Sequence, residues 1–228
     1  MSSSRVFVFI LALGFAFAPG RAAPVLPKVL CDRTVLVFGE PMATGTGVRD
    51  RGHSNLATRV HTFFDRVCHE GAEVKTVAGE GGRLVDTSSR VLKTLGDHPH
   101  SIAFIHFPFG DIAGGASVDR MLSTYRDVLN ACAAVGTLCI IGGQQPVNSL
   151  GVQATDRQLE LERRAAAEFG MRYLPLYRFF QSETTRRRLM VPLDAGDGRH
   201  LSDEGHALLF VLYRQRLLTL ANLQWMGS

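Results

Sequence analysis

The segment VLVFGEPMATG, residues 35–45, changes character in its middle. Its first four residues are apolar and typical of a buried strand, whereas Gly39 and the small residues that follow are typical of a loop. A strand end of this kind often presents reactive groups, because the backbone N–H groups that follow it are free to bind anions. The residue at the tip is Pro41, which has neither a hydroxyl nor a backbone N–H. The segment therefore predicts a strand end of the kind that forms an active site, but without a nucleophile at residue 41.

Four more short apolar or β-branched runs follow this first one along the chain. Helical patterns separate them, as in the segment where Leu56, Val60 and Phe64 share one helix face. Strands alternating with helices predict a parallel sheet between two helix layers. We expect a three-layer α/β/α sandwich of one domain, residues 34–222, with a last helix over about 202–220. The five strands are expected at residues 34–39, 72–78, 101–107, 137–142 and 171–176.

The N-terminus has the layout of a secretory signal peptide. Arg5 precedes thirteen apolar or small residues, 6–18, and small residues at Gly20 and Ala22 provide a cleavage site. The apolar run is short for a membrane span, which makes an uncleaved anchor the weaker alternative. We expect a signal peptide over residues 1–22, an N-terminal extension over 23–33, and a secreted or periplasmic mature protein.

Charge and composition exclude several classes of partner. The chain has 25 basic and 21 acidic side chains, and loss of Arg5 and Arg21 leaves 23 basic ones. This balance is not that of a nucleic-acid binder. The histidines and cysteines lack zinc-ligand spacing, and the glycine-rich segment lacks the spacing of a dinucleotide or phosphate loop. We expect no metal, no cofactor, no nucleic acid and no stable membrane span, while the oligomeric state is not determined by the sequence.

Four cysteines allow three pairings, and the sequence alone does not choose among them. The expected topology brings Cys31 and Cys68 to one edge of the sheet. Cys132 and Cys139 flank one helix-to-strand turn. The alternative for each residue is a buried free thiol.

The loop DAGDGRHLSDEGH, residues 194–206, carries a candidate catalytic pair. Asp197 precedes His200 by three residues, a spacing at which a carboxylate can orient an imidazole and stabilise its protonated form. In the alternative interpretation Asp197 caps a turn and His200 is merely exposed.

Together these segments resemble the SGNH hydrolases, also called GDSL esterases and lipases, over residues 34–213. That resemblance implies a flavodoxin-like fold and hydrolysis of ester bonds. The family has four characteristic sequence segments, here called blocks. The resemblance places Gly82 at an oxyanion position in the second block, VAGEGGRLVDT, and Asp197 and His200 in the last block. The first block falls on residues 39–41 and the third on PFGD, residues 108–111.

Two family residues are replaced in this chain. Pro41 stands where the family has its serine nucleophile, and Gly110 stands where it has an asparagine that donates to the oxyanion. Of the expected oxyanion donors only the Gly82 N–H is left. The resemblance therefore implies a member whose ester-cleaving machinery is impaired.

Two routes keep an active hydrolase as the alternative. Thr44, Thr46 or Ser54 would replace the nucleophile, or His200 would activate water directly while Arg83 stabilises the oxyanion. In the competing interpretation the threonines are ordinary turn residues and Arg83 is only a surface charge.

A binding site is the other interpretation of the same residues. Glu40, Arg83 and Asp111 would join Asp197 and His200 in a pocket for a small polar ligand or a carbohydrate ester. Alternatively, Arg83 only neutralises the carboxylates of Glu40 and Asp111, so that the former catalytic site stays folded without binding a ligand. Neighbouring strand ends would add His106, Gln144 and Gln145.

Overall fold

A computed structural model describes residues 28–39, 55–68, 70–77, 83–107, 110–144, 152–187, 193, 195 and 200–226. Its sheet has five parallel strands in the order β2-β1-β3-β4-β5, which confirms the predicted fold class. The strands are β1 (Val35–Phe38), β2 (Val74–Val77), β3 (Ile102–His106), β4 (Leu138–Gly142) and β5 (Tyr173–Leu174).

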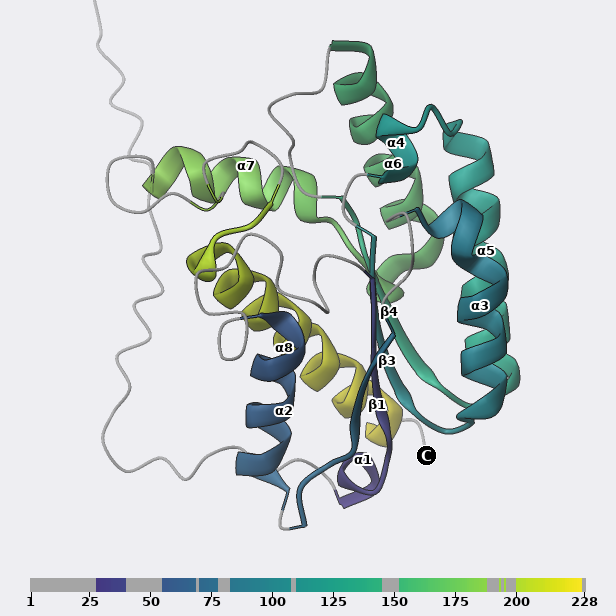
Figure 1. Cartoon of the computed structure of the whole chain (residues 1–228), viewed down its shortest axis with the longest axis vertical. Coiled ribbons are helices and arrows are strands. Elements are labelled where there is room, and N and C mark those ends of the chain that lie inside the picture. The colour runs from purple at the N-terminus through teal and green to yellow at the C-terminus, as the bar shows by residue number, and fades with distance from the viewer. Residues whose placement is uncertain are drawn as a thin grey trace, which may run out of the picture.

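Helices cover both faces of the sheet (Figure 1). The face covered by α2 and α8 also meets α1 and α7, and the opposite face is covered by α3, α4, α5 and α6. The helices are α1 (Lys28–Cys31), α2 (Leu56–Val67), α3 (Leu84–Asp97), α4 (Gly110–Ala113), α5 (Val118–Ala134), α6 (Val152–Phe169), α7 (Leu176–Arg187) and α8 (Asp203–Met226), with a 3-10 turn at Gly170–Arg172.

Strand residues alternate between the two halves of the core, as the period of two in a strand requires. In β1, Val35 and Val37 pack with α2 and α8, whereas Leu36 and Phe38 pack with α3 and α5. All four are fully buried, so each face of this interior strand is covered by helices. This burial explains why the strands are continuous apolar runs in the sequence.

Both expected cysteine pairs form disulfides. Cys31 in α1 is bonded to Cys68 at the end of α2, and Cys132 in α5 is bonded to Cys139 in β4. All four cysteines are therefore paired. The first bond attaches the N-terminal extension to the domain at the edge where the strands begin.

None of the helices in the described ranges is long and apolar enough to cross a membrane. The expected signal peptide, residues 1–22, lies outside these ranges, as do residues 23–27 of the extension.

Candidate functional site

The carboxyl ends of β1 and β3 are the centre of the candidate site. These two strands are neighbours in the sheet, but the chain leaves them toward different sides, a topology whose crevice commonly binds ligands. Directly after β1, Gly39 adopts φ +113°, and a Cβ there would overlap the carbonyl oxygen of His106. Only glycine allows this close approach of two backbones. At the predicted break in the first segment, the backbone of Gly39 therefore lies directly against the end of β3.

Several sequence-predicted site residues lie outside the described residues. They are Glu40, Pro41, Gly82 and Asp197, together with the substitute nucleophiles Thr44, Thr46 and Ser54 and the neighbouring Gln145. The roles expected for them stay predictions.

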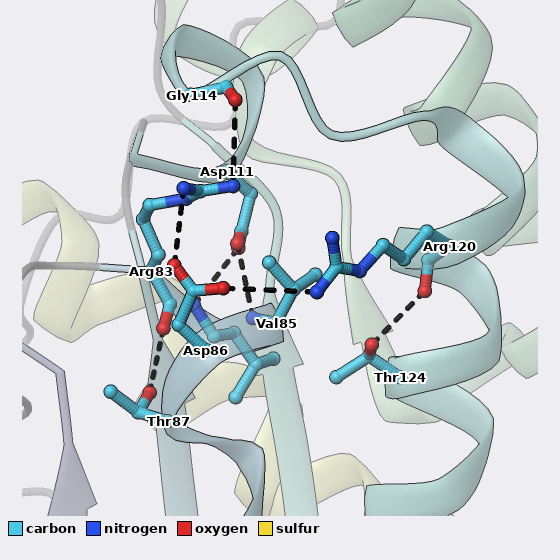
Figure 2. Close-up of polar contacts among 9 residues, drawn as sticks. Arg83, Val85, Asp86, Thr87, Asp111, Gly114, Arg120 and Thr124 are labelled. Carbon is cyan, nitrogen blue, oxygen red and sulfur yellow. Dashed lines mark hydrogen bonds and ion pairs between the residues drawn. The ribbon is translucent and has the colours of Figure 1, made fainter.

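The third block is tied to the start of α3 by Asp111 (Figure 2). Its side chain is 1 % exposed, and its two carboxylate oxygens accept hydrogen bonds from the backbone N–H groups of Leu84 and Val85, each at 3.1 Å. Burial raises the pKa of the Asp111 carboxyl, and the two backbone hydrogen bonds oppose that rise. Gly110, which the sequence resemblance aligns with the family's asparagine, is the first residue of the same short helix. The carboxylate therefore acts as a cap that joins α4 to the start of α3.

Arg83 packs over the other side of this junction. Its guanidinium forms an ion pair with Asp86 at 3.1 Å and donates to the Gly114 carbonyl at 3.5 Å, and Asp86 also faces Arg120 at 3.8 Å (Figure 2). A Cβ at position 114 would lie 2.5 Å from the guanidinium carbon, so the arginine occupies the space that glycine leaves. The structure thus brings Arg83 and Asp111 together around α4, and it directs the guanidinium to Asp86 and Gly114.

Removal of the Asp111 carboxylate is expected to destabilise the fold. Asp111→Ala leaves the N–H groups of Leu84 and Val85 buried without their acceptor, at a cost of about 2–4 kcal/mol in the free energy of unfolding. Urea denaturation measures this loss, with the exposed helical residue Asp127→Ala as the control expected to stay within about 0.5 kcal/mol. A loss at position 111 no larger than the control's would show that the cap contributes nothing.

Helix α8 holds the end of β3 in place through Tyr213. The Tyr213 hydroxyl donates to the carbonyl of Ile105 at 3.0 Å, and its ring packs edge-on against His106, with the ring centroids 6.4 Å apart. Gly142 of β4, in register with His106, makes room for the hydroxyl because a Cβ there would overlap it. Complete burial raises the pKa of the Tyr213 phenol well above its usual range. The phenol is therefore a neutral hydrogen-bond donor.

Two buried polar residues of α8 were missed by sequence reasoning. Tyr213 and His206 are seven residues apart in the last helix, which places them on one face two turns apart, and both are fully buried. A polar residue recurring at that spacing within an apolar helix face is the signal that identifies them. His106, which the sequence did place at a strand end, is also fully buried.

The candidate base His200 lies just before α8 and is partly exposed. Its carbonyl oxygen accepts from the N–H of Ala195 at 2.8 Å, and the Ser202 N–H donates to the Leu193 carbonyl at 2.9 Å. Ser202 then caps the helix, since its hydroxyl oxygen accepts from the N–H of Gly205 at 3.2 Å. These backbone contacts fix the segment that would carry a base at the entrance of the last helix.

No family model matches the sequence, and no curated protein is similar enough to count as a relative. Solved structures do match the fold. TesA superposes with a TM-score of 0.61 at 16% identity, covering 81% of this chain and 98% of that one. The acetyl xylan esterase AlAXEase gives 0.59 at 15%, covering 80% and 98%, and AlinE4, a SGNH-hydrolase family esterase, gives 0.52 at 17%, covering 71% and 84%. The chain therefore has the α/β fold of the SGNH-hydrolase esterases.

Proposed function

We propose that this protein is an exported SGNH-hydrolase-like protein that is impaired in ester cleavage and binds a polar ligand, of which a carbohydrate ester is the leading candidate. The observation that carries the proposal is Pro41, which lies two residues after Gly39 and which the sequence resemblance aligns with the family's serine. Export agrees with the N-terminal signal-like segment and with two disulfides, which persist in oxidising compartments. In a simpler version of this proposal, the residues of the former catalytic site only stabilise the fold and bind no ligand.

The expected losses in reaction rate favour an impaired protein over a slow enzyme. Removal of a triad nucleophile costs on the order of a million-fold in rate, and one oxyanion donor about a hundred- to a thousand-fold when it is lost alone. Proline removes both the hydroxyl and a backbone donor, and Gly110 removes a side-chain donor. Although such losses do not add fully, the rate by the family mechanism is expected to lie near background. Asp197 and His200 would then form a base with no hydroxyl to activate.

The neighbouring acetyl xylan esterase suggests the class of ligand. Its name describes an enzyme that acts on an acetylated polysaccharide. A protein with the same fold and a polar strand-end edge is suited to bind such a carbohydrate without cleaving it. This is why we place carbohydrate esters ahead of other polar ligands.

The alternative is an active hydrolase with a rearranged site. One version needs Arg83 as the oxyanion donor, yet its guanidinium is already engaged by Asp86 and the Gly114 carbonyl. The other version needs Thr44, Thr46 or Ser54 as the nucleophile. We favour the binding protein because ligand binding at the carboxyl ends of the strands needs neither a substitute nucleophile nor a new oxyanion donor.

A fluorophosphonate probe and a p-nitrophenyl acetate assay on the mature protein test the proposal. We expect no residue to be labelled stoichiometrically and no saturable turnover above the rate in buffer. Labelling at a single threonine or serine, mapped by mass spectrometry, would identify a substitute nucleophile. Turnover without labelling that disappears in His200→Ala would instead establish a histidine-activated water. Either result replaces the proposal with the active alternative.

A further inference from the structure

Gln144 follows β4 at the edge of the sheet where the candidate site lies. Its side chain is 2 % exposed, and within the described part of the chain neither its Oε1 nor its Nε2 has a hydrogen-bond partner. A carboxamide offers one acceptor and a two-proton donor, so neither half of its hydrogen-bonding capacity is used by the described residues. Buried polar side chains in folded proteins usually have at least one partner.

The backbone around Gln144 is held without help from this side chain. Gln158 of α6 donates from Nε2 to the Gln144 carbonyl at 2.9 Å, and the Gly143 N–H donates to the Leu174 carbonyl at 2.8 Å. The carboxamide is therefore not needed to position the strand end. Its burial requires a different explanation.

Two buried carboxylates of the same protein show the contrast. Asp111 uses both oxygens to cap α3, and Glu162 uses both to cap α7, where it accepts from the N–H groups of Tyr177 at 2.7 Å and Arg178 at 3.3 Å. In each case burial of a polar group is offset by hydrogen bonds to backbone. The described residues give Gln144 no such compensation, so an apolar side chain of the same size would be more favourable there in the ligand-free protein.

The position of Gln144 suits a group that contacts a ligand. It lies two residues beyond Gly142, which is paired in register with His106 at the end of β3. The carboxyl ends of β1 and β3 flank the point where the strand order reverses, and ligands of open parallel sheets bind outside this edge. A ligand that reaches the carboxamide there is shielded from water, which strengthens its hydrogen bonds.

We propose that the Gln144 carboxamide is a recognition group for a ligand that presents a donor and an acceptor side by side, as two adjacent hydroxyls of a sugar ring do. One hydroxyl donates to Oε1 and its neighbour accepts from Nε2, so both unused atoms are satisfied at once. The inference rests on the proposed function, because it names the carbohydrate moiety that the strand-end site recognises. It does not depend on whether the bound ester is cleaved.

Calorimetric titration of the mature protein with xylotriose tests the inference. The variants are Gln144→Met, which replaces the carboxamide with an apolar chain of similar length, and Gln215→Met, a matched change at an exposed position of α8. We expect wild type and Gln215→Met to bind with affinities within two-fold of each other. Gln144→Met should bind at least about ten-fold more weakly, since two hydrogen bonds are lost. Permethylated xylotriose, which has no hydroxyl donors, should not bind to wild type.

The melting temperature of the ligand-free variants separates recognition from a structural role. Gln144→Met is expected to melt at the wild-type temperature or above, because it removes a buried group to which the described residues offer no hydrogen bond. Unchanged binding by Gln144→Met, or a melting temperature several degrees lower, would overturn the inference, as would the absence of xylotriose binding to wild type. Labelling by the fluorophosphonate probe would instead refute impaired catalysis and leave the role of Gln144 standing.

Discussion

The double variant Pro41→Ser/Gly110→Asn is expected to hydrolyse p-nitrophenyl acetate at least about a hundred-fold faster than the parent protein. The serine restores a nucleophile and a backbone donor together, and the asparagine restores a side-chain donor. Gly110 is the first residue of α4 and is not among the described glycines with positive φ, so its backbone can accept a side chain. The initial rate of ester hydrolysis, measured on purified mature protein, checks the prediction.

The single variants make this experiment specific. Gly110→Asn alone has no nucleophile and should stay at the parent rate, whereas Pro41→Ser alone should recover part of the activity. Adding His200→Ala to the double variant should abolish the gain, because the serine then has no base. If the double variant folds and shows no gain, the assignment of the blocks or the survival of the pocket is wrong.

Gly39→Ala is expected to cost roughly 4 kcal/mol or more in the free energy of unfolding, or to prevent folding. The residue combines a φ of +113° with a backbone contact that leaves no room for a Cβ beside the His106 carbonyl. Neither β1 nor β3 can move away, because both are central strands buried between helices. Urea and thermal unfolding monitored by circular dichroism measure the loss.

Gly96→Ala is the matched control. Gly96 lies inside α3 with nothing within 4 Å of the position its Cβ would take, so alanine there should stabilise the helix by about 1 kcal/mol. The two substitutions are chemically identical, and opposite signs are expected. A small effect at position 39 would mean that the turn after β1 can relax, and the rigid platform inferred for this strand end would be lost.

The hydrophobic periodicity was enough to predict the architecture. Continuous apolar strands require cover on both faces, and strands that alternate with helices require parallel pairing. The boundaries were less accurate at the edge of the sheet. The fifth strand was expected at residues 171–176, but only Tyr173 and Leu174 pair with β4, because a 3-10 turn precedes them and Pro175, which has no N–H, follows. The last helix also continues to Met226, beyond the expected end at 220.

The candidate site was predictable only in part. The family resemblance proposed Arg83 and Asp111 as site residues, but a carboxylate looks the same in sequence whether it faces a ligand or the start of a helix. Asp111 accepts from N–H groups that lie 26 and 27 residues earlier in the chain, and only the packing of α4 against α3 creates that contact. The same holds for Tyr213, whose acceptor Ile105 lies 108 residues away.

The sequence by itself determined the order of the elements, the layers they form and the absence of a hydroxyl at residue 41, since these follow from local periodicity and side-chain chemistry. Only the tertiary structure decided which polar groups are used. Hydrogen bonds join atoms across distant segments, so folding committed Asp111 to a helix cap and Arg83 to Asp86, while it left the carboxamide of Gln144 buried without a partner among the described residues.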